Sequence, residues 1–296
     1  MSSLLRPNES YRPLEVRRGD WMVLLSAVCF STMPIFGSFA YAAGMGVYSL
    51  LAWRFLLAVT MLSGMLVVSG RLSPLPKEKL AGFIGMGAMY FVMSFLYFQA
   101  LKLAPISTLT LLFYTYPAIV TVLAAILLKE RISRVKATAL ALALGGCLLV
   151  LRPSELGSGR GAAFALVASG MYSGFLLWGT PLTRGTDAVL CTTLILSVSG
   201  IGYVVVALFR RDLEIPRGTA AWAPILGLAA VSTVMSDVLF FWGLPRTGAS
   251  RAAILSTLEP ACTLALSGLF LGESIPPARL LGGALILASV VLIHRE

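Results

Sequence analysis

Long apolar runs, broken by short stretches of glycine, proline and charged residues, follow one another along almost the whole chain. A helix that crosses a bilayer needs about 20 predominantly apolar residues, and breaks of this composition mark the turns between helices. The pattern therefore predicts ten membrane-spanning helices, and the shortest links between them require antiparallel neighbours. The predicted spans are residues 20–40, 47–69, 79–101, 105–128, 134–151, 161–181, 187–209, 220–243, 249–271 and 277–293.

Composition favours a multi-pass membrane protein over a soluble one. Hydrophobic residues make up 58% of the 296 residues and charged residues only 12%, whereas a soluble domain carries about 25% charged residues. Too few polar side chains remain to cover a surface that faces water. No apolar segment precedes the basic residues near the start, so no cleavable signal is expected. Residues 1–19 are predicted to form a polar cytoplasmic tail.

Lysine and arginine are distributed unevenly over the predicted loops. When alternate loops are assigned to alternate sides of the membrane, the side with the N-terminus carries roughly twice as many as the other side. Most of this bias comes from the first half of the chain. Because such loops are retained in the cytoplasm, both termini are predicted to be cytoplasmic. The loops also account for the formal net charge of +10, so no nucleic-acid partner is expected.

The cysteines give no sign of a redox or metal site. All four lie within apolar runs, form no CxxC pair and lack nearby histidines. Disulfide and metal sites are both disfavoured by this arrangement, and the protein is expected to use neither a metal nor a cofactor.

The chain repeats itself at an offset of 143 residues. Pro117 is followed by Glu130 and Pro260 by Glu273, in each case thirteen residues later, where the apolar run ends. Ten spans divide into two sets of five, and an odd number per set inverts the second set in the membrane. Inverted repeats are common in secondary transporters, with the substrate site between the halves. The predicted repeats cover residues 20–152 and 161–296.

The two segments 117–150 and 260–293 each contain a proline within a helix, a glutamate at the helix end and a following helix rich in glycine and alanine. This pattern resembles the paired EamA domains of the drug/metabolite transporter superfamily, and it covers nearly the whole chain as two copies. The aromatic segments 90–97 and 112–116 are similar to those of YddG-type amino-acid exporters within that superfamily. The resemblance implies export from the cytoplasm of a bacterial-type cell by alternating access, without enzyme chemistry.

Positions at which the repeats differ are candidates for substrate contacts, because a substrate has no two-fold symmetry. Tyr116 corresponds to Glu259, and Ser94 corresponds to Asp237. These acids lie well inside predicted spans, where a charge costs at least about 2.5–3.5 kcal/mol. They are expected to face a cavity and bind an ammonium group or carry a proton, or else to be neutralised by Arg54 or by hydroxyl groups. Arg54 is itself typical of a structural residue that pairs or extends to the interface, with a substrate carboxylate as the alternative partner.

Aromatic residues mark the predicted cavity wall. Tyr90 and Tyr97 are seven residues apart and share one helix face with Ser94, and a phenol that faced lipid would lack a hydrogen-bond partner. Pro117 and Pro260 are each expected to remove a helix hydrogen bond, which is tolerated where the freed carbonyl lines a cavity. The predicted substrate-binding residues are Tyr90, Ser94, Tyr97, Tyr114, Tyr116, Trp178, Asp237, Trp242, Ser256 and Glu259, with Pro117 and Pro260 as helix kinks at the cavity.

The sequence thus predicts an all-α integral membrane protein that acts as a secondary transporter in the cell inner membrane. It is expected to export amino acids, with aromatic and other neutral ones favoured, or similar small metabolites, as a monomer in lipid. A drug or polyamine proton antiporter is the alternative, although residues 23–39 lack the acid that the small multidrug relatives carry in their first helix. An enzyme is disfavoured because the only histidine is His294 and no HExxH or GxSxG motif is present. Coupling to protons is left open.

Overall fold

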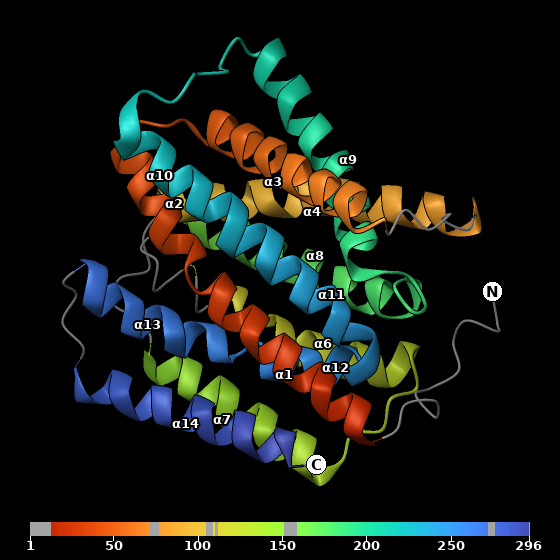
Figure 1. Cartoon of the computed structure of the whole chain (residues 1–296). Helices are drawn as coiled ribbons and strands as arrows, with labels where there is room; N and C mark the ends of the chain where they lie inside the picture. The colour runs from red at the N-terminus through yellow and green to blue at the C-terminus, as the bar shows by residue number, and fades with distance from the viewer. Residues whose placement is uncertain are drawn as a thin grey trace.

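The structure, a computed structural model, describes residues 13–70, 77–104, 109, 112–150, 159–271 and 276–295. Over these ranges all regular secondary structure is helical, without a strand (Figure 1). Residues 1–12 of the predicted tail lie outside the described residues, as does Glu273. The predicted all-α fold class is confirmed.

Each predicted span corresponds to one helix or to a broken helix. The first five spans are α1 (Pro13–Phe30) with α2 (Met33–Ala42), α3 (Val47–Ser69), α4 (Lys77–Leu103), α6 (Tyr116–Leu127) and α7 (Arg134–Val150). The second five are α8 (Gly159–Leu182), α9 (Ala188–Phe209), α10 (Gly218–Ala229) with the π-helix η3 (Ala230–Met235) and α11 (Ser236–Thr247), α12 (Ala249–Leu255) with α13 (Leu258–Leu271), and α14 (Pro277–His294). Eight of the ten units in the described residues are long and apolar enough to cross a membrane, and α6 and α7 are shorter.

The first helix extends further toward the N-terminus than predicted. It begins at Pro13 rather than at residue 20, and Glu15 lies in its first turn. Proline is well suited to a first helical position because no backbone N–H is needed there, and an acidic side chain interacts favourably with the positive end of the helix dipole. Polarity alone therefore misplaced this boundary.

The two halves pack as related repeats. Helix α3 packs against α9 and α7 against α14, so corresponding helices of the two halves meet directly; α4 packs on α8, just as its counterpart α11 packs on α1. Small residues allow these contacts: a Cβ on Gly146 of α7 would lie 2.6 Å from the carbonyl oxygen of Gly282 on α14. A Cβ on Gly243 of α11 would lie 2.7 Å from the carbonyl oxygen of Gly19 on α1. Such close backbone approach at glycine is typical of membrane helices.

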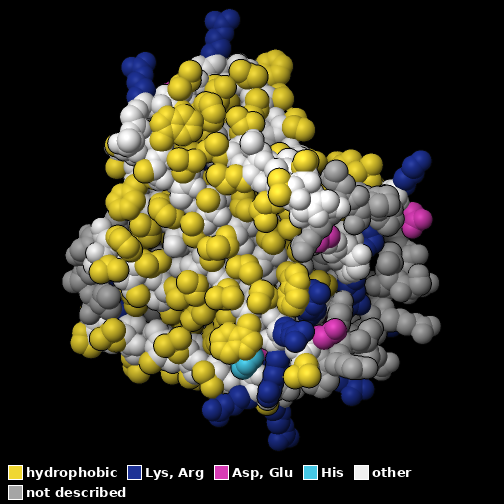
Figure 2. Space-filling model, viewed as in Figure 1, with side chains coloured by type: hydrophobic (Ala, Val, Ile, Leu, Met, Phe, Trp, Pro, Cys, Tyr) yellow, Lys and Arg dark blue, Asp and Glu magenta, His cyan; other side chains and the backbone are white. Residues whose placement is uncertain are grey.

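An apolar surface surrounds this core. Hydrophobic side chains cover most of the face in Figure 2, and lysine and arginine gather at its margins. Large apolar residues such as Val68 and Phe209 are 89% and 86% exposed. A soluble monomer rarely exposes contiguous apolar patches larger than a few hundred Å², whereas lipid accepts them. The structure confirms a multi-pass membrane protein.

Three spans are interrupted, and a proline follows each interruption. The first span breaks at residues 31–32 before Pro34, the fourth at 114–115 before Pro117, and the ninth at 256–257 before Pro260. Each proline stands in the first turn of the second helix, where its missing N–H costs nothing. At Pro117 and Pro260 the predicted kink takes the form of a two-residue turn, which backbone hydrogen bonds still cross, and the proline lies in the first turn of the helix that follows.

Hydroxyl side chains satisfy the carbonyl groups at these breaks. A carbonyl that lacks a partner in the bilayer core costs several kcal/mol, and here each carbonyl accepts from both the backbone N–H and the hydroxyl of one threonine. The hydroxyl donates to the carbonyl oxygen three residues earlier in every case: Thr32 to Cys29 at 2.6 Å, Thr115 to Leu112 at 2.8 Å, and Thr257 to Ile254 at 2.6 Å.

The eighth span contains an irregular turn of a different kind. Between α10 and α11, the segment η3 is π-helical, and Thr233 donates to the carbonyl oxygen of Leu228, five residues earlier, at 2.7 Å. A π turn holds one residue more than an α turn, so it rotates the following side chains by about 100°. Such turns are frequent at functional sites. Both Thr233 and Asp237 are buried on the interior side of this span.

Candidate functional site

A cavity lies between the two halves, where the helix breaks converge. Its volume is about 50 Å³, and it receives side chains from both repeats. Phe30, Met33, Phe113 and Glu259 reach it from residues next to the breaks. The residues that line it are Phe30, Met33, Arg54, Tyr90, Met93, Ser94, Tyr97, Phe98, Phe113, Tyr172, Phe175, Asp237, Phe240 and Glu259.

Aromatic rings in mutual contact form much of the wall. The rings of Tyr97 and Phe113 have centroids 5.2 Å apart, and Phe113 stacks on Tyr172 at 5.5 Å. Tyr90 and Phe175 continue the surface, also at 5.5 Å. Aromatic pairs at these separations hold one another in place, so the wall presents a broad apolar face to a bound molecule.

Arg54 brings a positive charge to the cavity from α3. The residue is 1% exposed, and its Nε donates to Thr233 Oγ1 at 2.7 Å. Its guanidinium carbon lies 5.0 Å from the ring centroid of Phe55 and 5.3 Å from that of Phe98. The buried Nη2 has no hydrogen-bond partner. A buried cation needs compensation, which the described residues supply only in part.

Two carboxylates face the same cavity and differ in their surroundings. Asp237 is 2% exposed and accepts a hydrogen bond from the Tyr90 hydroxyl at 3.2 Å. Glu259 is half-buried, and among the described residues no hydrogen bond or ion pair satisfies the geometric limits for its carboxylate. The nearby Tyr114 hydroxyl interacts with Glu259 electrostatically, and it too lacks a hydrogen-bond partner. Glu259 is therefore the more available acceptor.

The structure brings half of the predicted substrate-binding residues to the cavity. Tyr90, Ser94, Tyr97, Asp237 and Glu259 line it directly.

Three others lie buried behind this first layer. Tyr116 packs on the rings of Phe113 and Tyr172, with centroids 5.5 and 4.8 Å away, and Tyr114 packs beside Tyr116. Ser256 stands at the break of the ninth span.

The two predicted tryptophans lie away from the cavity, which corrects the expectation that they line it. Trp178 is 44% exposed, and its ring packs over Gly85 of α4. Trp242 carries the Arg246 guanidinium over its ring at 3.7 Å. Helix rotation explains both positions: Trp178 is about 120° around α8 from Tyr172, and Trp242 is about 140° around α11 from Asp237.

Several cavity residues were missed by the sequence analysis. Arg54 was treated as mainly structural, and Tyr172 and Phe175 on α8 were not considered. A signal for the last two was present, because residues three apart share a helix face. The proline at residue 34, within the first span, also pointed to the break beside Phe30.

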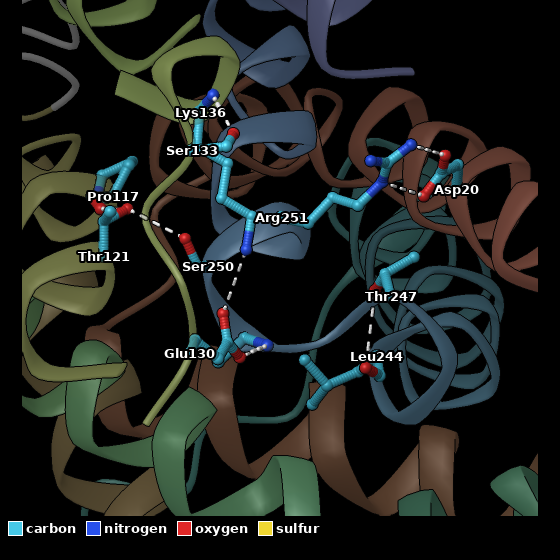
Figure 3. Close-up of polar contacts among 11 residues, drawn as sticks. Asp20, Pro117, Thr121, Glu130, Ser133, Lys136, Leu244, Thr247, Ser250 and Arg251 are labelled. Carbon is cyan, nitrogen blue, oxygen red and sulfur yellow. Dashed lines mark hydrogen bonds and ion pairs between the residues drawn. The ribbon is translucent and has the colours of Figure 1, made fainter. Parts of the chain in front are cut away.

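A second charged cluster joins three helices at one end of the bundle. We call it the end cluster; it consists of Asp20 on α1, Arg251 on α12 and His294 on α14 (Figure 3). Arg251 Nε and Nη2 donate to the two carboxylate oxygens of Asp20 at 2.9 and 2.7 Å, and His294 Nδ1 lies 3.0 Å from Asp20 Oδ2. Asp20 is 0% exposed and Arg251 7%. This bidentate pair ties the first half of the protein to the second.

Glu130 makes a further link between the halves at this end. Its carboxylate accepts a hydrogen bond from the backbone N–H of Ala249, at the start of α12, at 3.2 Å. Lys136 lies 3.5 Å from the other carboxylate oxygen (Figure 3). The repeated glutamate of the first half thus fixes the start of a helix in the second half.

Both halves of the chain match one family model, that of the EamA-like transporter family, at residues 17–152 and 159–295. The chain belongs to the EamA-like transporter family. It is therefore a membrane transporter built from two EamA repeats, and not an enzyme.

Similar proteins carry the same general description. An uncharacterized transporter of Archaeoglobus fulgidus is 29% identical, over 95% of this chain and 98% of that protein. The uncharacterized transporter YcbK of Bacillus subtilis is 27% identical, over 94% of this chain and 93% of its own length. A solved crystal structure shares the fold with a TM-score of 0.77 at 19% identity, over 93% of this chain and 95% of that one. The two uncharacterized transporters agree with a transport function and name no substrate, and the solved structure supports the fold.

Proposed function

We propose that this EamA transporter exports amino acids, with aromatic and other neutral ones favoured, or similar small metabolites, as a YddG-type exporter of the inner membrane with both termini in the cytoplasm. The observation that carries the proposal is the Glu259 carboxylate, which faces an aromatic cavity and, among the described residues, has no cationic partner and only the Tyr114 hydroxyl nearby as a donor. An ammonium group supplies the missing charge and the missing donors. A hydrogen bond to a charged group contributes about 1.5–3 kcal/mol.

The aromatic wall supports the choice of side chain. An apolar amino-acid side chain gains free energy when its surface leaves water, at roughly 25 cal/mol per Å². The rings of Phe113, Tyr172 and Phe175 offer such a surface next to Glu259. A charged side chain would lose hydration against these rings without gaining partners.

Cavity size supports alternating access. A buried water needs at least about 10–15 Å³ of cavity volume, so the cavity of about 50 Å³ holds a few waters. An aromatic amino acid is larger, so the wall has to move apart when it binds. The helix breaks beside Phe30, Phe113 and Glu259 lie where that movement is required.

Exchange in liposomes tests the proposal. Purified protein in vesicles loaded with phenylalanine is expected to take up labelled phenylalanine, and external leucine should compete. Phenylpropionate, which keeps the ring and carboxylate but lacks the ammonium, should compete at least about tenfold more weakly, because one charged hydrogen bond is lost. The same assay with and without a proton gradient measures coupling.

Site variants locate the contact. Glu259→Gln should lower amino-acid exchange, whereas Trp178→Phe, a matched change outside the cavity, should not. Equal competition by phenylpropionate would contradict the assignment of Glu259. Exchange of putrescine without exchange of any amino acid would favour the alternative, a drug or polyamine antiporter.

A further inference from the structure

The Arg54 guanidinium takes no part in the proposed binding of the ammonium group by Glu259. It is 1% exposed and lines the cavity, and its buried Nη2 has no hydrogen-bond partner. An unsatisfied donor on a buried charge is costly. Arg54 interacts electrostatically with Asp237 and Tyr90, but among the described residues it forms no close ion pair, and the carboxylate of Asp237 accepts its hydrogen bond from Tyr90. The cavity therefore contains a fixed cation, and its Nη2 donor has no partner among the described residues.

Thr233 fixes the position of this cation. Its hydroxyl proton is donated to the carbonyl oxygen of Leu228 at 2.7 Å, so a lone pair of Oγ1 is left to accept from Arg54 Nε, also at 2.7 Å. The rings of Phe55 and Phe98 flank the guanidinium within the 6 Å range of cation–π contacts. The Nε side of the planar group is thus occupied, and Nη2 remains for a ligand.

The repeat explains why this arrangement joins the two halves. Thr233 and Tyr90 are 143 residues apart, so they occupy corresponding positions. The first-half hydroxyl orients Asp237 of the second half, and the second-half hydroxyl holds Arg54 of the first half. Each repeat contributes one charged group, and the other repeat positions it.

We propose that Arg54 is an anion subsite that binds the carboxylate of the substrate, and that Thr233 is its positioning residue. The inference rests on the proposed function: Glu259 takes the ammonium and Arg54 the carboxylate, so that the cavity selects zwitterions over amines and acids. Arginine suits this role because its planar fork matches a carboxylate, whereas lysine offers a point charge.

A pair of competitors that differ only in the carboxylate tests the subsite. Phenethylamine keeps the ring and ammonium of phenylalanine, and in the wild type it should compete with labelled phenylalanine at least about tenfold more weakly than phenylalanine itself. In Arg54→Gln and in Thr233→Val, phenethylamine should compete almost as well as phenylalanine, so that the ratio of the two approaches one. Thr233→Ser should retain it, because the hydroxyl is restored.

Thr192→Val is the matched control for Thr233→Val. Thr192 is equally buried, and its hydroxyl donates to a carbonyl oxygen of its own helix, Ala188, at 2.7 Å. The control removes the same group from α9 and should leave the preference unchanged. If Thr233 had only a structural role, Thr233→Val and Thr192→Val would both lower total exchange. Neither would then change the preference for phenylalanine over phenethylamine.

A binding measurement separates this inference from the proposed function. Phenylpropionate, as a carboxylate probe, should raise the thermal unfolding temperature of the detergent-solubilised wild type and of Thr233→Ser, but not of Arg54→Gln or Thr233→Val. If these shifts in unfolding temperature are found but the wild type exchanges no amino acid, the anion subsite is supported and amino-acid export is contradicted. Equal stabilisation of Arg54→Gln, or an unchanged preference in that variant, would overturn the subsite.

Discussion

The end cluster and the cavity both contain buried charged groups. Only in the end cluster are these groups paired with hydrogen-bonded partners of opposite charge. Both carboxylate oxygens of Asp20 have partners, from Arg251 and from His294. In the cavity, Arg54 Nη2 has no hydrogen-bond partner among the described residues, and Glu259 has only the nearby Tyr114 hydroxyl and no cation. Burial of an unpaired charge is expensive, and a buried pair with good geometry offsets much of that cost. The difference shows which cluster is complete as folded and which one a ligand completes.

The largest expected effect comes from breaking the matched pair. Asp20→Ala leaves Arg251 buried without its bidentate partner, which costs about 3–5 kcal/mol of unfolding free energy. Chemical unfolding of the detergent-solubilised protein measures the loss.

Two comparisons check its cause. Lys136→Gln breaks the more exposed pair with Glu130 and should cost less than about 1 kcal/mol. The double change Asp20→Leu with Arg251→Leu should recover most of the stability, since no lone charge is left. An Asp20→Ala loss no larger than that of Lys136→Gln would show that the pair contributes little.

Glu259→Gln should lower amino-acid exchange without lowering stability, in contrast to Asp20→Ala. The change keeps the shape and removes a charge that has no cationic partner among the described residues, so stability should stay equal or increase. Amino-acid exchange in liposomes should fall at least about tenfold, because the charged hydrogen bond to the ammonium is lost. A large loss of stability together with normal exchange would mean that Glu259 resembles Asp20 after all.

Tyr172 and Trp178, two of the aromatic residues of α8, provide a smaller contrast. Tyr172→Ala removes a ring from the cavity wall and should weaken exchange of phenylalanine more than exchange of alanine, by about three- to tenfold, since aromatic contacts contribute roughly 0.5–1.5 kcal/mol beyond burial. Trp178→Ala, on the exposed side of the helix, should leave that ratio within about twofold. The concentration of each amino acid that gives half-maximal exchange is the measurement. Equal changes in both variants would remove Tyr172 from the wall.

The smallest effect is expected at a helix break. Thr257→Val deletes the hydroxyl that donates to the carbonyl oxygen of Ile254, and polar side-chain hydrogen bonds within membranes average about 0.6 kcal/mol. Thermal unfolding in detergent should show a small decrease, and Thr257→Ser should show almost none. A loss as large as that of Asp20→Ala would mean that the break depends on this single bond.

Hydropathy was enough to predict the architecture, because ten apolar runs leave few alternatives in a bilayer. The repeat offset likewise identified Asp237 and Glu259, since buried acids are rare and both interrupt the symmetry. The choice between a structural and a substrate role for Arg54 stayed open because its hydrogen-bond partner, Thr233, is 179 residues away, a separation that no local pattern spans. The tryptophans were misplaced because the facing side of a helix depends on its rotation within the bundle, and rotation follows from packing that a single sequence does not contain.

The local capping at the helix breaks has one more consequence. Thr32, Thr115 and Thr257 each add a hydroxyl donor to a carbonyl oxygen that their own backbone N–H also reaches, so the angle of a span can change at the turn without exposing a bare carbonyl to lipid. We therefore expect the three breaks to act as hinges whose stiffness comes from side-chain packing as well as from backbone hydrogen bonds. Motion around the cavity is then limited by how well the aromatic rings repack, and the size of the cargo becomes a determinant of turnover speed as well as of affinity.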